Sequence, residues 1–118
     1  MHDEPVLDPR PLQELVDMGA GDDLLPELIQ LCREDVPVRI EAISRGLASG
    51  DRKLILSEAH QLKGALGNLG LRRFAGLASR LEEAAGEGPL DGLAPLVAAL
   101  PAAFEEALAA LEAAFPRP

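Results

Sequence analysis

Apolar residues recur every three or four positions along almost the whole chain, and no segment alternates apolar and polar residues as a half-buried strand would. This period is that of amphipathic helices, so we predict an all-α fold. Capping residues, prolines and glycines divide the pattern into one short helix and four long ones. Four long amphipathic helices with short connections predict an up-down-up-down four-helix bundle, with the short extra N-terminal helix capping one end.

The first two predicted helices have distinct start signals. Asp8 serves as N-cap of the short helix, and Pro9 is its first helical residue. The second helix begins at Asp22 or Asp23 and ends near Gly50. The inward positions are Leu12, Leu15 and Val16 in the first helix and Leu25, Ile29, Cys32, Val36, Ile40, Ile43 and Leu47 in the second.

Prolines interrupt two of the long helices. The nitrogen of Pro37 cannot donate to the carbonyl of Arg33, so we expect a kink in the second helix or a break into two collinear pieces. The last helix begins near Asp91, and we expect an irregularity at Pro101. Its inward positions are Leu93, Val97, Leu100, Phe104, Leu108, Leu111 and Phe115.

The third and fourth helices are joined by a very short turn. Asp51 caps the third helix, which runs to about Asn68, and the turn at Leu69-Gly70 predicts that the next helix folds back antiparallel. The fourth helix ends in the glycine- and proline-rich stretch 86–89. The inward positions are Ile55, Ala59, Leu62, Leu66 and Leu69 in the third helix and Leu71, Phe74, Leu77, Ala78, Leu81 and Ala85 in the fourth.

A second strip of the third helix carries unusual residues. At about 100° per residue, His60, Lys63, Gly64 and Gly67 share this strip, which faces away from the core, so we predict an exposed imidazole. A glycine inside a helix costs roughly 1 kcal/mol relative to alanine, so folding explains the two glycines poorly. We expect a large partner to dock there. Leu56, one turn before His60, is either a docking contact or an ordinary exposed leucine.

Length and composition fit a single domain over residues 1–118, of which 47 % are hydrophobic. The acidic N-terminus lacks the pattern of a secretory signal, and the longest apolar run, from Leu93 to Phe104, is shorter than the roughly 18 residues of a membrane span. Cys32 is the sole cysteine, and its apolar stripe indicates core packing. A chain that cannot form an internal disulfide fits a reducing compartment. We therefore predict a cytoplasmic protein without membrane insertion.

Charge is unevenly distributed. The net charge of −9 argues against nucleic acid as a partner. The segment from Arg52 to Arg80, however, has six basic residues and one acidic residue, whereas the rest of the chain has five basic and nineteen acidic residues. The histidine thus lies in a cationic stretch, which suits a site that handles negative charge.

The histidine strip has the groups that phosphoryl transfer needs. An exposed imidazole is mostly neutral at pH 7 and keeps a lone pair on one ring nitrogen, which is a nucleophile toward phosphorus. Lys63 offers positive charge beside the phosphoryl oxygens, and Gly64 and Gly67 would let another protein approach. Metal binding is not expected, because the chain lacks the paired Glu-x-x-His segments of a bundle metal centre. No hydrolase, P-loop or protein-kinase motif is present.

Two motifs carry a family resemblance, and they read Ala59-His60-x-x-Lys63-Gly64-x-x-Gly67-x-Leu69-Gly70 and Leu81-Glu82-Glu83-Ala84-Ala85. They resemble the histidine-containing phosphotransfer (HPt) domains of two-component phosphorelays, and no motif position departs from the pattern. The likeness extends to residues 6–9 and 50–51, so it covers nearly the whole chain. It implies that His60 is phosphorylated, that Lys63 stabilises the phosphate, and that Gly64 and Gly67 give clearance to an incoming receiver domain.

The resemblance also implies a helical bundle that relays a phosphoryl group between receiver-domain aspartates and has no kinase activity of its own. The expected partners are response-regulator receiver domains and a hybrid sensor histidine kinase, and we expect a monomer. No cofactor is expected, because Mg²⁺ would be held by the receiver. One alternative is a non-catalytic interaction module that binds a receiver or a partner helix without carrying phosphate. A more distant alternative is a helical dimerisation domain.

Overall fold

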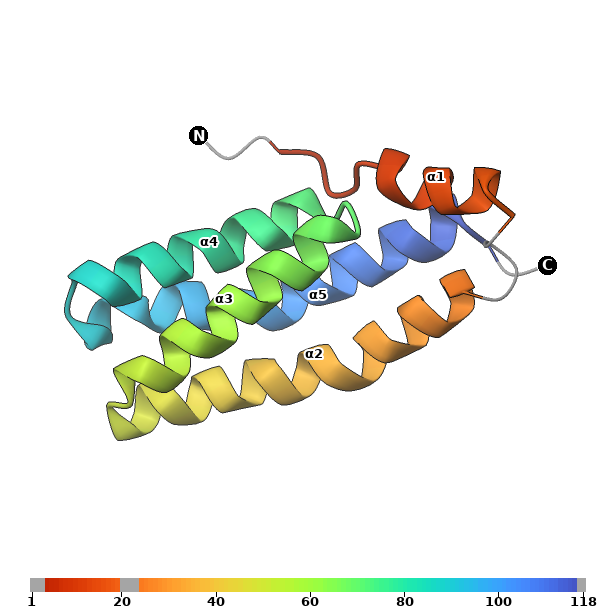
Figure 1. Cartoon of the computed structure of the whole chain (residues 1–118). Coiled ribbons are helices and arrows are strands. Elements are labelled where there is room, and N and C mark those ends of the chain that lie inside the picture. Colours follow the sequence, from red (N-terminus) through yellow and green to blue (C-terminus); the bar gives the residue numbers. More distant parts are fainter. Residues whose placement is uncertain (1–3, 20–23, 117–118) are drawn as a thin grey trace.

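The computed structural model describes residues 4–19 and 24–116, and all regular structure in these ranges is helical. Figure 1 shows the four long helices side by side, each antiparallel to the next, with the short first helix at the end where the third helix turns into the fourth. The predicted all-α four-helix bundle with a short N-terminal helix is therefore confirmed. The elements are α1 (Arg10–Asp17), α2 (Leu24–Ser49), α3 (Arg52–Asn68), α4 (Arg72–Glu87), a 3₁₀ turn η1 (Leu90–Leu93) and α5 (Ala94–Ala114).

The predicted inward stripes form most of the core. All six inward positions of α4 are buried, and Phe74 of α4 meets Phe104 of α5 edge-on, with ring centroids 6.0 Å apart. Val16 is an exception, since it is exposed. The reason is that α1 lies over the end of the bundle and buries only Leu12. Other predicted core residues at helix ends or edges are half-buried, namely Leu15, Ile29, Leu47, Leu69 and Phe115.

Both prolines lie inside unbroken helices. Of the two outcomes predicted at Pro37, a kink or a break into two collinear pieces, the break does not occur, because one helix runs from Leu24 to Ser49. Pro37 and Arg33 are both exposed, so the carbonyl that loses its intrahelical partner lies on the water-facing side. Pro101 likewise lies inside α5, which starts after η1 rather than at Asp91. The predicted start of the second helix, at residues 22–23, lies outside the described residues.

Tight contacts at both ends of α3 fix the helix that carries the histidine. At its start, Asp51 accepts a hydrogen bond from the backbone nitrogen of Leu54 at 3.1 Å, as predicted for the N-cap. At its end, Gly70 turns the chain with a φ of +86°, and its carbonyl accepts from the nitrogen of Asp8 at 2.7 Å. The N-cap of α1 is Pro9 rather than the predicted Asp8, and the Asp8 carboxylate accepts from the nitrogen of Arg10, the first residue of α1, at 3.1 Å.

The C-terminal helix is unusually apolar. Among the described residues, the stretch Leu90–Ala114 is the one helical segment long and apolar enough to cross a membrane, with a mean hydropathy of 1.5 over 18 residues. One side of it, which includes Val97, Leu100 and Phe104, is buried in the bundle core. Part of its apolar character therefore serves the packing of the bundle.

Candidate functional site

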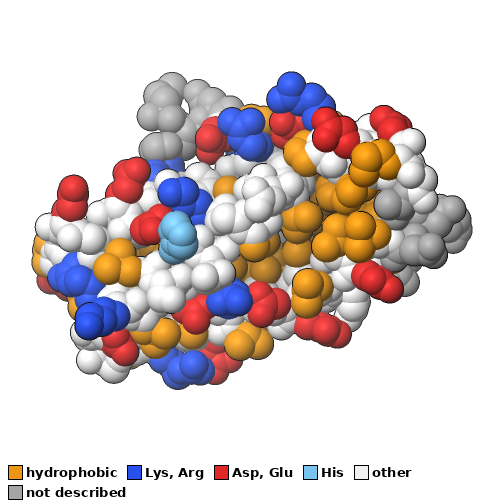
Figure 2. Space-filling model, in the orientation of Figure 1, with side chains coloured by type: hydrophobic (Ala, Val, Ile, Leu, Met, Phe, Trp, Pro, Cys, Tyr) orange, Lys and Arg blue, Asp and Glu red, His pale blue; other side chains and the backbone are white. Residues whose placement is uncertain are grey.

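His60 lies midway along α3 on the water-facing side. Its side chain is 66 % exposed, whereas Ala59 beside it is completely buried and Leu62 almost so. This is the arrangement that the helical period predicts. Figure 2 shows the histidine on the surface of this face, with basic and acidic side chains beside it. An imidazole in this position can be reached by another protein.

A carboxylate from the neighbouring helix holds the imidazole. Nδ1 of His60 lies 2.8 Å from Oε2 of Glu82 on α4, and Nζ of Lys63 lies 3.4 Å from Oε1 of the same carboxylate. Glu82 is only 25 % exposed and therefore holds a defined position between the two side chains. Glu82 stands in the second motif but is not one of the predicted site residues. Only the pairing of α3 with α4 brings it opposite His60.

The ionisation of Glu82 decides which ring nitrogen carries the proton. Partial burial alone would raise the pKa of this carboxyl, but the hydrogen bonds from His60 and Lys63 outweigh that effect and lower the pKa below its ordinary value. Glu82 is therefore an anion at neutral pH and can only accept hydrogen bonds. Nδ1 of His60 must then be the donor. In the neutral ring, this leaves the lone pair on Nε2.

Several cations of the stretch around the histidine pair with carboxylates from elsewhere in the chain. Lys63 contacts Glu82, and Arg73 contacts Glu106 on α5 at 3.2 Å. The charged group nearest to the ring is thus an anion rather than a cation. The sequence prediction missed this because it counted charges along the chain, whereas these partners are adjacent only in the folded bundle.

The two glycines of the strip have different surroundings. A β-carbon on Gly64 would meet nothing within 4 Å apart from its own helix, whereas one on Gly67 would lie 3.6 Å from the β-carbon of Ala75 on α4. Leu56 is half-buried and packs against the core. Of the three predicted docking residues, only Gly64 faces open space, because Gly67 faces Ala75 on α4 and Leu56 packs against the core.

An apolar groove between α2 and α3 adjoins this face. It has a volume of about 160 Å³, and its lining includes Leu28 and Leu31 from α2 and Ala65 and Leu69 from α3. Leu31 is 59 % exposed. Figure 2 shows hydrophobic side chains gathered on the face that carries the histidine. Leu28 and Leu31 are not among the predicted site residues, because they lie beside the inward stripe of α2.

Other candidate chemistry is not supported by the described part of the chain. Across residues 4–19 and 24–116, no group of three or more His, Cys, Asp or Glu side chains is arranged to hold a metal ion. Cys32 is buried, as its apolar stripe predicts, and burial raises the pKa of its thiol. The site therefore consists of the imidazole, its carboxylate and lysine neighbours, and the open helix face.

Comparisons with known proteins identify the family of this chain. A sequence model of the Hpt domain matches residues 27–114. The chain belongs to the Hpt domain family. A comparison with curated proteins gives no match. The fold is similar to the crystal structure of histidine-containing phosphotransfer protein B (HptB) from Pseudomonas aeruginosa PAO1, with a TM-score of 0.83 and 27 % sequence identity over 95 % of this chain and 96 % of that chain.

Family membership fixes the general activity. Hpt domains carry phosphoryl groups on histidine in phosphorelays and interact with the receiver domains of response regulators. They are phosphocarriers rather than autonomous kinases. The resemblance drawn from the two sequence motifs is thereby confirmed, and so is the prediction of a phosphocarrier.

Proposed function

We propose that this Hpt domain accepts a phosphoryl group on Nε2 of His60 from the phosphorylated aspartate of one receiver domain and passes it to the aspartate of another. One observation carries the proposal. The only histidine among residues 4–19 and 24–116 is exposed and is hydrogen-bonded through Nδ1 to a carboxylate, next to a glycine that faces open space. This combination supports a nucleophilic Nε2 that a large partner can reach.

The transfer step follows from this geometry. The lone pair on Nε2 attacks the phosphorus of the acyl phosphate, and the bond between phosphorus and the aspartate oxygen breaks as the nitrogen–phosphorus bond forms. The carboxylate of the receiver leaves with the electron pair of the broken bond. The ring, which keeps its proton on Nδ1, becomes positively charged, and the Glu82 carboxylate at 2.8 Å stabilises that charge. Transfer to the next receiver reverses these steps.

Lys63 and Glu82 have complementary roles in this proposal. Glu82 orients the ring and selects its tautomer. Lys63 carries a flexible ammonium group one helical turn from His60, and its present contact with Glu82 is long, at 3.4 Å. We propose that the ammonium moves from Glu82 to the phosphoryl oxygens when these arrive, since phosphoryl transfer depends on positioning and on positive charge beside those oxygens.

We assign the docking of the receiver to the face that carries Leu56, Gly64 and Gly67. The open space at Gly64 supports this assignment, and the apolar groove between α2 and α3 extends it. Mg²⁺ required for the reaction is supplied by the receiver. We further propose that residues 1–118 form a single monomeric domain in the cytoplasm, and that a hybrid sensor histidine kinase is one of its partners.

A transfer assay tests the proposal. Incubation with a phosphorylated receiver is expected to label the chain in an acid-labile, alkali-stable form, and His60→Gln is expected to remain unlabelled. Lys63→Gln should still be labelled, but more slowly. Labelling of the His60→Gln variant would show that the site assignment is wrong. If the chain binds receivers but is never labelled, it is instead an interaction module that carries no phosphate.

A further inference from the structure

The segment that precedes α1 lies against the start of α4, beside the turn between α3 and α4 (Figure 1). Two backbone groups of the segment are held there. The nitrogen of Asp8 donates to the carbonyl of Gly70 at 2.7 Å, and Nε of Arg73 donates to the carbonyl of Glu4 at 3.0 Å. The segment is therefore fastened to the α3–α4 turn at two points.

The sequence makes room for this segment. A β-carbon on Gly70 would overlap the carbonyl of Asp8, and one on Gly76 would overlap the carboxylate of Glu4. Gly76 lies inside α4, and the missing side chain leaves space that the carboxylate of Glu4 occupies. The Glu4 side chain thus lies against the backbone of α4, although nearly half of it is exposed.

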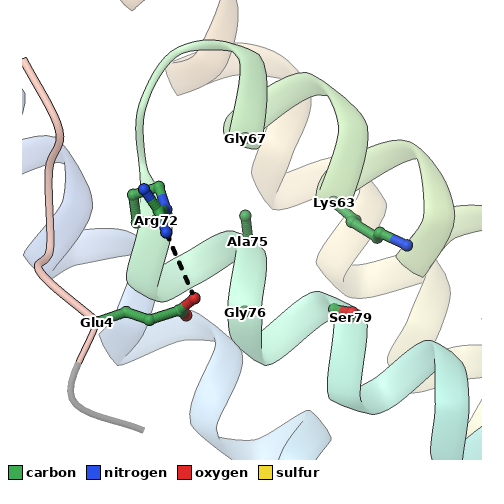
Figure 3. A pocket seen from close by; sticks show the side chains of 7 residues that line it. All are labelled: Glu4, Lys63, Gly67, Arg72, Ala75, Gly76 and Ser79. Carbon is green, nitrogen blue, oxygen red and sulfur yellow. Dashed lines mark ion pairs between the residues drawn. The ribbon is translucent and has the colours of Figure 1, made fainter. Parts of the chain in front are cut away.

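That place is one end of a groove between α3 and α4. The groove has a volume of about 470 Å³, and Glu4, Lys63, Gly67, Arg72, Gly76 and Ser79 are among its lining residues. Figure 3 shows Glu4 reaching toward Arg72 at one end, whereas Lys63 stands further along the groove. The acidic end of Glu4 therefore shares a groove with the lysine that stands one turn from His60.

The charges of the groove indicate what else it would accept. Apart from Glu4 itself, its charged lining residues are Lys63 and Arg72, and small residues between them leave the helix backbones accessible. Nη2 of Arg72 lies 3.9 Å from Oε1 of Glu4, and both side chains are nearly half exposed. Ion pairs between exposed groups are weak, so another carboxylate can replace Glu4 at low cost.

We infer that Glu4 is a built-in competitor that occupies the Arg72 end of this groove and is displaced by an acidic side chain of a docking receiver domain. The inference rests on the proposed function, because it assumes that a receiver docks beside His60. It assigns a partner contact to Arg72 and a regulatory role to the N-terminal segment. The segment would weaken docking without touching the reacting atoms.

Receiver binding and transfer rates test this inference together. The test uses low salt and the receiver domain that binds most tightly in a panel. Glu4→Gln is expected to lower the dissociation constant of this receiver by about two- to fivefold, with little change in the maximal transfer rate. Arg72→Gln is expected to raise this constant by a similar factor. In the Arg72→Gln background, Glu4→Gln should then have no further effect. Added salt should reduce both effects.

A matched control separates competition from overall charge. Glu105→Gln removes one carboxylate from an exposed position on α5 and should leave the dissociation constant unchanged. If the control shifts the constant as much as Glu4→Gln does, or if the effects of Glu4→Gln and Arg72→Gln simply add, the inference is wrong. A receiver that binds without labelling His60 contradicts the proposed function alone, and a chain that binds no receiver contradicts both.

Discussion

Glycine occurs at the two ends of α3 and in its middle for different physical reasons. At the α2–α3 end, a β-carbon on Gly46 would lie 3.0 Å from Cγ1 of Ile55 and 3.3 Å from the carbonyl oxygen of Asp51. At the α3–α4 end, Gly70 has a positive φ and is pressed against Asp8. In the middle, Gly64 has open space around it. Packing and backbone conformation explain the glycines at the two ends of α3, whereas nothing in the fold requires a glycine beside His60.

This difference separates a structural glycine from a functional one. Glycine costs stability inside any helix, and packing requires neither Gly64 nor Gly86, which both face open space. We propose a role in partner docking for Gly64 alone, because it lies one turn from the imidazole that a partner must reach. Substitutions test the contrast between the middle of α3 and its ends.

The largest effect is expected from Gly64→Leu, which should reduce phosphoryl transfer at least about tenfold, equivalent to about 1.4 kcal/mol, because the new side chain blocks docking. The folded state should lose nothing, since leucine favours a helix more than glycine does. Gly86→Leu is the matched control, since Gly86 also faces open space, near the end of α4. Transfer rates and urea unfolding of both variants provide the measurement. Unimpaired transfer in a folded Gly64→Leu protein would remove the clearance argument.

The next effect concerns the carboxylate that holds the ring. Glu82→Ala should lower the maximal transfer rate about tenfold, the scale of a lost hydrogen bond to a charged group, and Glu82→Gln should restore part of it by keeping an acceptor for Nδ1. Glu83→Ala, an exposed neighbour with the same change in charge, is the control. Single-turnover transfer rates decide the outcome. Equal rates for Glu82→Ala and Glu83→Ala would mean that the hydrogen bond contributes nothing.

Replacing glycine by alanine should change the free energy of unfolding in opposite directions at a closely packed position and at an open one. Gly46→Ala is expected to destabilise the fold by about 1 kcal/mol, because neither the buried Ile55 nor the backbone of Asp51 has room to move. Gly64→Ala is expected to stabilise it by up to about 1 kcal/mol. Urea unfolding at neutral pH measures both. Two shifts of the same sign would erase the distinction between the ends and the middle of α3.

The smallest effect is the acid sensitivity of the Asp8 carboxyl, which pairs with Arg10 beside the Gly70 end of α3. Hydrogen bonds from the side chain and backbone of Arg10 lower the pKa of the Asp8 carboxyl from its ordinary value of 3.8 to about 2. Because the folded state holds the carboxylate more tightly, Asp8 stabilises the fold above about pH 4, and this contribution is lost as the pH falls toward 2. Asp8→Asn should flatten the pH dependence of stability in this window, slightly and more in low salt. Identical slopes for Asp8→Asn and the unmodified protein would contradict this.

The helices and the exposure of His60 could be predicted from the sequence, because long amphipathic segments repeat their apolar positions with one period. The period alone placed Ala59 and Leu62 in the core and His60 on the surface. Residues near helix ends followed the period less well. Val16 is exposed because α1 lies over the end of the bundle and buries only Leu12.

Contacts between helices could not be predicted in the same way. Glu82 lies 22 residues from His60, and only the register of α3 against α4 makes them partners. The same limit applies to Glu4, which meets Arg72 and Gly76 through the fold. Pro37 illustrates a different limit, since the local rule could not decide between a kink in one helix and a break into two. The helix continues there because the carbonyl of Arg33 lies on the water-facing side.

The position of the phosphoryl group on the ring tests the account most directly. Nitrogen-15 NMR of the phosphorylated protein distinguishes the two ring nitrogens and identifies the residue that carries the group. The account predicts one phosphohistidine, at His60, bonded through Nε2, with the proton on Nδ1 directed at Glu82. A phosphoryl group on Nδ1, or on any residue other than His60, would contradict it.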